Sequence, residues 1–114
     1  MYGKNLLLTH HLTKLIKYAS IVYTLARALI LQNKGMIDKA IENCNKILKF
    51  EPDNSVAYYN RSCFNCSKGE TKQALSDLAK AIELNPECRS WAKTEKDFDK
   101  IRNNPRFKEL ITEK

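Results

Sequence analysis

Apolar residues recur every three or four positions along most of this chain, which is the period of an amphipathic α-helix. No proline or glycine interrupts residues 4–33, and one apolar stripe runs through them in alternating steps of four and three. The stripe consists of Leu8, Leu12, Leu15, Ala19, Val22, Ala26 and Leu29. We expect one long helix here, or two helices with a bend near residues 18–20. Gly35 is expected to follow this helix in the left-handed conformation that ends many helices.

The same period continues after Gly35 and predicts helices over residues 37–50, 55–67 and 71–84. Pro52 separates the first two, because the residue before a proline avoids helical angles. The side chain of Asp53, Asn54 or Ser55 is expected to cap the second. The apolar face of the first of these helices comprises Ile37, Ala40, Ile41, Cys44, Ile47 and Leu48. That of the third comprises Ala74, Leu75, Leu78, Ala81 and Ile82.

The pattern in the last quarter of the chain predicts shorter helices. They span residues 88–93 and 95–102, and a final one begins at Pro105, since proline suits the first helical turn. The apolar residues Phe98, Ile101, Phe107, Leu110 and Ile111 are expected to face inward. Trp91 is expected to fill the space between residues 55–88 and the C-terminal tail that follows them. No segment shows the alternation of a β-strand, so the sequence predicts an all-α fold.

Two stretches of the chain repeat at a spacing of 34 residues. The segment GMIDKAIENCNKILKFEP matches GETKQALSDLAKAIELNP. The matched pairs are Gly35 and Gly69, Ala40 and Ala74, Lys46 and Lys80, Leu48 and Ile82, Phe50 and Leu84, and Pro52 and Pro86. A shared period with small, apolar and breaker residues in phase is typical of stacked helical hairpins. Ala40 and Ala74 are expected where two helices cross closely.

The residues at this spacing resemble the tetratricopeptide repeat, whose period is 34 residues. With the two prolines at the closing position of each repeat, the repeats span residues 21–54 and 55–88. Residues 89–114 resemble a capping segment found after such repeats, and residues 1–20 form a separate basic helical segment. The resemblance implies a right-handed α-α superhelix of helical hairpins that holds a protein or peptide partner, as an adaptor or assembly scaffold. It implies no enzymatic activity.

In this family the first helix of each repeat lines a concave groove. The matching positions here are Val22, Leu25 and Leu29 in the first repeat and Val56, Tyr59, Asn60, Cys63 and Cys66 in the second. An exposed apolar strip of this kind usually marks a partner site. Three occupants are open: an extended or helical apolar peptide, a second copy of the chain, or the chain's own residues 5–18.

The formal charge of +7 is uneven along the chain. Residues 1–34 contain five bases and no acid, whereas residues 35–114 are nearly balanced. The bases of the first segment are Lys4, Lys14, Lys17, Arg27 and Lys34. An alternative function is therefore binding of a membrane surface or nucleic acid through this segment. A solvated helix face explains the charge more simply, so we do not expect nucleic acid as a partner.

The longest apolar stretch, residues 15–31, is interrupted by Lys17 and Arg27. The uninterrupted part is far shorter than the roughly 20 residues that a spanning helix needs. We expect no transmembrane segment and a cytoplasmic location. An organelle presequence is a weaker alternative, since the first segment lacks acids but contains a single arginine.

Few residues offer catalytic or cofactor chemistry. The chain has three glycines, too few and too scattered for a phosphate-binding loop. Cys63 and Cys66 form a C-x-x-C pair, but they lie within a predicted helix rather than in the knuckle typical of zinc sites. His10 and His11 are adjacent and would point roughly 100° apart on a helix. We expect no cofactor, no metal and no catalytic residue, and small buried or groove-lining cysteines in a reducing compartment.

Overall fold

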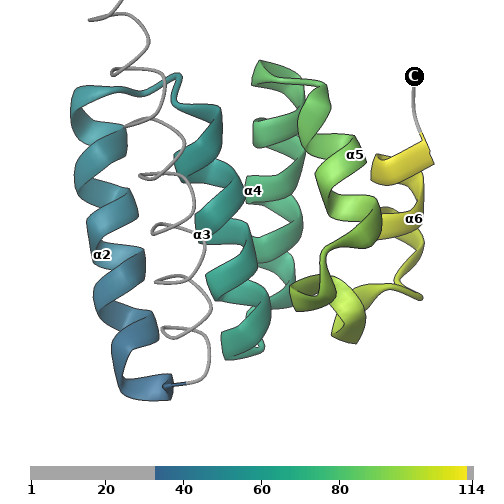
Figure 1. Ribbon diagram of the computed structural model, residues 1–114, viewed down its shortest axis with the longest axis horizontal. Helices are drawn as coiled ribbons and strands as arrows, with labels where there is room; N and C mark the ends of the chain where they lie inside the picture. Colours follow the sequence, from purple (N-terminus) through teal and green to yellow (C-terminus); the bar gives the residue numbers. More distant parts are fainter. Residues whose placement is uncertain (1–32, 113–114) are drawn as a thin grey trace, which may run out of the picture. The chain divides into compact units, whose positions relative to one another are not determined.

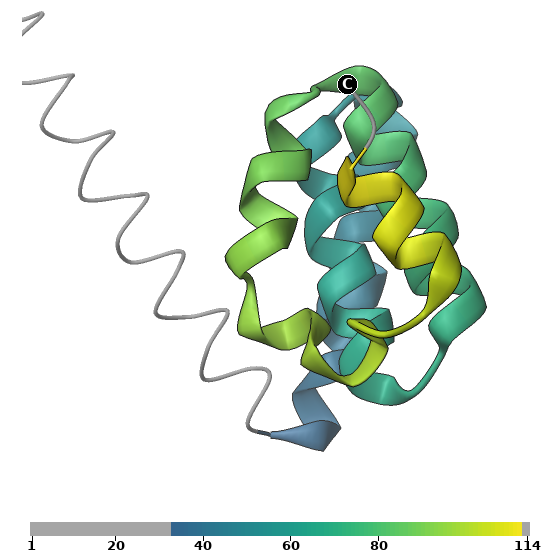
Figure 2. The same cartoon turned by 90° about the vertical axis from the view of Figure 1, so that its right-hand side faces the viewer.

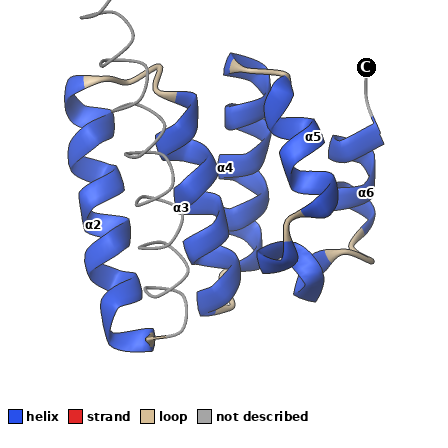
Figure 3. Cartoon of the chain, viewed as in Figure 1, coloured by secondary structure: helices blue, strands red, loops and turns tan. Residues whose placement is uncertain are grey.

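Five α-helices and one short 3-10 helix, joined by short turns, make up the part of the chain that the computed structural model describes, residues 33–112. They are α2 (Lys34–Phe50), α3 (Ser55–Lys68), α4 (Thr71–Leu84), α5 (Glu87–Thr94), the 3-10 helix η1 (Lys96–Ile101) and α6 (Pro105–Thr112). Figure 3 shows no strand among them, as the sequence predicts. None of these helices is long and apolar enough to cross a membrane. The predicted N-terminal helix, the domain boundary at residue 20 and the positions Val22, Leu25 and Leu29 lie outside the described residues.

The helices α2, α3, α4 and α5 pack in chain order, each beside the next (Figure 1). The helices α3 and α4 form an antiparallel hairpin, and α2 lies on the other side of α3. Figure 2 looks onto the C-terminal end and shows α5 beside α6, which also contacts α4. The short helix η1 returns to α3. The second repeat is therefore enclosed between α2 and the tail.

Local sequence accounts for both ends of α3. Its first turn is capped by Asn54, whose Oδ1 accepts a hydrogen bond of 2.9 Å from the backbone N–H of Ala57. It ends at Gly69, which has a φ of 90° and donates its N–H to the carbonyl of Cys66. Glycine adopts this left-handed conformation at little cost in free energy, because it has no Cβ atom. The predicted cap is confirmed, and α3 ends one residue beyond the predicted residue 67.

The prediction for Gly35 was wrong. Of the two described glycines, Gly69 alone has a positive φ, and Gly35 lies in the first turn of α2. That helix begins at Lys34, three residues before the predicted start. Gly69 ends a helix in a left-handed conformation, whereas Gly35 already has helical geometry within α2. Equivalent positions in the two repeats thus have different backbone conformations.

Small side chains occupy the tightest places in the fold, as the repeat pattern predicts. Ala74 and Ala81 on α4 are fully buried, and Ala40 on α2 is buried as well. The hydroxyl of Ser62 on α3 donates a hydrogen bond of 2.6 Å to the carbonyl of Ala74, so the two helices approach closely at this point. Ile47 differs from the prediction, since it is exposed rather than inward.

The tail completes the interior of the second repeat. Phe98 and Phe107 are fully buried, with ring centroids 5.4 Å apart, and belong to the same apolar cluster as Leu78 on α4. Ile101 and Leu110 join this cluster. The predicted inward positions of the tail are therefore confirmed.

Candidate functional site

The five predicted groove residues within the described part all lie on α3 and differ sharply in exposure. Val56 is 45% exposed, whereas Tyr59, Asn60, Cys63 and Cys66 are each at most 4% exposed. Among these five groove residues of α3, only Val56, at the N-terminal end of the helix, exposes an apolar side chain to solvent. A binding role for the set stays a prediction.

The C-terminal segment contacts this line of α3. The Tyr59 ring meets the rings of Trp91 and Phe98 edge-on, with centroids 5.4 and 5.8 Å away. Further along α3, a side-chain oxygen of Glu95 and one of Asp97 lie within 4.8 Å of the Cys63 sulfur. The tail is thus an occupant of this face that the three alternatives drawn from the sequence did not include.

Trp91 fills space as expected, but it is not a complete plug. Its ring packs edge-on against Tyr59, yet the residue stays 39% exposed. Val56 precedes Tyr59 by one turn of α3, and the Trp91 ring contacts the Tyr59 ring. We refer to Val56, Tyr59 and Trp91 as the aromatic surface.

Burial favours the protonated form of three of the thiols, those of Cys44, Cys66 and Cys88. Burial raises the pKa of Cys44 and of Cys88 to about 11, and it also raises the pKa of Cys66. Because thiolates rather than thiols act as nucleophiles and metal ligands, these three side chains are poorly suited to either role at neutral pH.

One group among the described residues has ligand types that a metal accepts, namely Cys63, Glu95 and Asp97. Zinc in proteins takes four ligands, or three and a water molecule. Each of the three residues already takes part in another interaction. We therefore assign no metal to this group.

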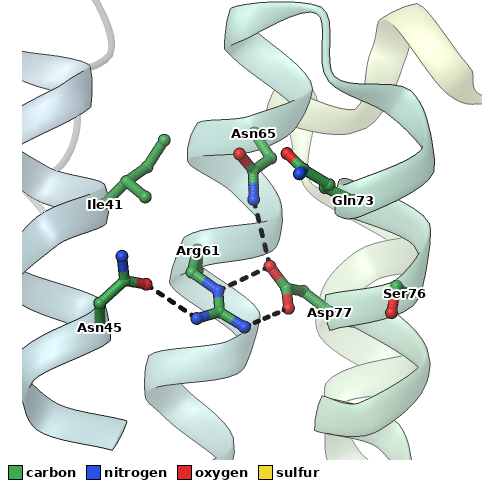
Figure 4. A pocket seen from close by; sticks show the side chains of 7 residues that line it. All are labelled: Ile41, Asn45, Arg61, Asn65, Gln73, Ser76 and Asp77. Atoms are coloured by element: carbon green, nitrogen blue, oxygen red, sulfur yellow. Dashed lines mark hydrogen bonds and ion pairs between the residues drawn. The ribbon is translucent and has the colours of Figure 1, made fainter.

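A polar cleft lies on another side of α3, between α2 and α4 (Figure 4). Its volume is about 380 Å³. The lining residues, which define the polar cleft, are Ile41, Asn45, Arg61, Asn65, Gln73, Ser76 and Asp77. Ile41 and Asn45 come from α2, Arg61 and Asn65 from α3, and the other three from α4.

Arg61 connects the walls of the polar cleft by hydrogen bonds. Its Nε and Nη2 atoms donate hydrogen bonds of 2.9 and 2.7 Å to the two carboxylate oxygens of Asp77, and its Nη1 donates one of 2.8 Å to Asn45 Oδ1 (Figure 4). Asn65 Nδ2 donates a further bond of 3.1 Å to Asp77. The hydrogen bond with Asp77 raises the pKa of Arg61 above its already high value. Paired donors in this planar arrangement are among the stronger hydrogen bonds in proteins.

This cluster was not predicted from the sequence, although one signal for it is present there. Asp77 lies one turn after Ala74 and one turn before Ala81, within the inward stripe of α4. An acid in that position needs a partner, since buried charges are normally paired. The partners Arg61 and Asn65 lie on the preceding helix.

Comparison with known proteins agrees with this architecture. A family model described as tetratricopeptide repeat matches residues 23–54 and 55–88, which together make up more than half of the chain. DnaJ homolog subfamily C member 3 from Bos taurus is 38% identical over 50 residues, which cover 44% of this chain and 10% of that protein. The chain thus corresponds to a small part of that relative, and no solved structure matches it. The two adjacent matches, together with the α3–α4 hairpin enclosed by neighbouring helices, show that the chain belongs to the tetratricopeptide repeat family.

Proposed function

We propose that this chain binds a partner peptide or helix and acts as an adaptor or assembly scaffold. Tetratricopeptide repeats are generally protein-interaction modules, which supports this class of function. The observation that carries the proposal is the aromatic surface, where Val56, one helical turn from Tyr59, and Trp91, whose ring contacts Tyr59, both remain exposed. Val56 and Tyr59 lie on α3, the helix that lines the groove in this family, and Trp91 lies on α5.

The chemistry of this surface suits an apolar anchor on the partner. Tryptophan is enriched among residues that contribute most to protein interfaces. The contact with Tyr59 restricts the Trp91 ring, so less side-chain freedom is lost on binding. Val56, one helical turn from Tyr59, adds exposed apolar area. An apolar side chain from an extended or helical partner segment would complete the contact.

The domain boundaries and the cellular location that we propose are those expected from the sequence. We infer that residues 21–114 form the repeat domain, with residues 1–20 as a separate basic segment. A cytoplasmic location is proposed, since all four cysteines are free thiols and a reducing compartment keeps them so. No catalytic role is proposed.

The chain offers a built-in reporter, because Trp91 is its one tryptophan. We expect an apolar peptide, selected from a library for binding to the whole chain, to shift the fluorescence of Trp91 saturably. The variant Val56→Glu should lose this binding. Phe50→Glu is the matched control, since it removes an exposed apolar side chain from the end of α2 and should bind normally.

Two outcomes would contradict the proposal. One is a set of selected peptides that bind without any change in Trp91 fluorescence. The other is equal loss of binding in Val56→Glu and Phe50→Glu. Strong weakening of binding by salt, with loss on replacing the bases of residues 1–34, would favour the basic segment instead. Light scattering on the same samples would show whether the aromatic surface pairs with a second copy.

A further inference from the structure

We propose that the polar cleft is a second binding site, which takes an extended peptide segment through its main-chain carbonyl and amide groups. The site is distinct from the aromatic surface and does not depend on it. With both sites occupied, one chain would bridge two segments of one partner, or two partners.

The two sites lie on opposite sides of α3. A helix advances roughly 100° per residue, so the side chains of Tyr59 and Arg61 diverge by roughly 200°. Val56 and Asn65, nine residues apart, diverge by roughly 180°. Figure 4 shows Arg61 and Asn65 between the side chains of α2 and those of α4. A ligand in the cleft would therefore leave the aromatic surface accessible.

Much of the hydrogen-bonding capacity of the cleft is unused. A guanidinium group has five N–H donors, and Arg61 uses three of them on Asp77 and Asn45. Asn45 accepts one of these bonds through Oδ1, which leaves its amide donors available. The side chains of Gln73 and Ser76 are exposed and have no hydrogen-bond partner among the described residues. The lining therefore offers a surplus of donors with a few acceptors.

The charges of the residues that line the polar cleft favour a neutral ligand. The single positive charge of the lining, on Arg61, is matched by the carboxylate of Asp77. An anionic ligand would have to compete with Asp77 for the guanidinium, and separating a largely buried pair is costly. A phosphate or free carboxylate is therefore a poor fit.

An extended peptide meets these requirements. Its main chain alternates carbonyl acceptors with N–H donors, and a primary amide such as that of Gln73 can pair with both. Recognition through the main chain is an established way to bind extended segments. The volume of about 380 Å³ lies in the range of small-ligand sites. Ile41, on the α2 wall, offers one apolar contact for a side chain of the peptide.

The test uses the full chain labelled with ¹⁵N and a short neutral peptide of glycine, serine and glutamine, acetylated and amidated at its ends. We expect saturable shifts of the side-chain amide signals of Asn45 and Gln73. The variants Gln73→Ala and Ser76→Ala should each weaken binding about fivefold, which corresponds to roughly one net hydrogen bond. Lys72→Ala, at an exposed neighbouring position on α4, is the matched control and should bind as the wild type does.

Each remaining outcome counts against the cleft as a peptide site. Shifts that do not saturate would overturn the proposal. Equal shifts with glycerol or glucose at the same concentration would show a general polar site, and equal weakening by Lys72→Ala would place binding elsewhere. Both substituted side chains are exposed, so the variants should retain the fold, which circular dichroism checks. Binding should persist in Val56→Glu, so failure of the aromatic surface and failure of the cleft are distinguishable.

Discussion

Arg61 on α3 holds Asp77 on α4 by two hydrogen bonds of 2.9 and 2.7 Å. A third bond from the same guanidinium, 2.8 Å long, reaches Asn45 on α2. Because α2 belongs to the first matched repeat and α3 and α4 to the second, one side chain links the two repeats. In repeat proteins the interfaces between neighbouring repeats contribute a large part of the stability. Arg61 is therefore expected to matter beyond its own helix.

Replacing Arg61 by leucine should lower the free energy of unfolding by about 2–3 kcal/mol. The Asp77 side chain, 9% exposed, would be left with Asn65 as its remaining hydrogen-bond partner. Urea unfolding followed by circular dichroism measures the change. Arg106→Leu is the control, because it breaks an exposed pair with Glu109 and should cost less than about 1 kcal/mol.

The double variant Arg61→Leu, Asp77→Leu separates pairing from the loss of each side chain. It removes the uncompensated charge, so its destabilisation should be clearly smaller than the sum of the two single effects. Additive effects, or an Arg61→Leu variant no less stable than Arg106→Leu, would show that the pair contributes little.

The repeat architecture could be predicted because it depends on spacing that a sequence displays directly. Ala74, Gly69 and Pro86 punctuate the second repeat in phase with the first, and the observed helices of that repeat follow them closely. The prediction for Gly35 was wrong because glycine is compatible both with the end of a helix, as at Gly69, and with the first turn of a helix, as at Gly35. Periodicity specifies the order of the elements better than the conformation of one residue.

The surfaces were harder to predict. The resemblance placed Tyr59 and Cys63 in an open groove, but it did not say how far the tail would extend over α3. The cluster of Arg61 and Asp77 depends on residues 16 positions apart, whose contact follows from the crossing of two helices rather than from a local pattern. Tertiary packing decides both features.

Enlarging Ala74 should test the close approach of α3 and α4. This residue is fully buried, and its carbonyl accepts the 2.6 Å hydrogen bond from Ser62. We expect Ala74→Leu to lower the free energy of unfolding by about 1–3 kcal/mol, because the added atoms must displace well-packed neighbours. Lys72→Leu, which adds apolar volume at an exposed position of the same helix, should have little effect. Equal stability of the two variants in urea unfolding would contradict close packing at Ala74.

Stability should fall at alkaline pH through the buried thiols. In the folded state the pKa of Cys44 and of Cys88 is about 11, compared with 9.0 for an unperturbed cysteine. The unfolded chain therefore releases these protons first, and the stabilisation present below pH 9.0 is lost as the pH rises toward about 11. Urea midpoints measured across this interval should decrease. Lysines and tyrosines titrate there too, so the double variant Cys44→Ala, Cys88→Ala is the control, and its midpoint should fall less steeply.

The two repeat-equivalent glycines should respond with opposite sign to the same substitution. Gly69→Ala places a Cβ at a φ of 90°, where no neighbouring atom lies within 4 Å, so any cost is conformational. A left-handed residue with a side chain costs roughly 1–2 kcal/mol. Gly35→Ala replaces a glycine inside α2, where alanine is the better helix former, and should raise stability by roughly 0.5 kcal/mol. Thermal or urea unfolding of the two variants beside the wild type measures both effects. A loss of stability at both positions would mean that Gly35, too, depends on a conformation or contact that only glycine permits.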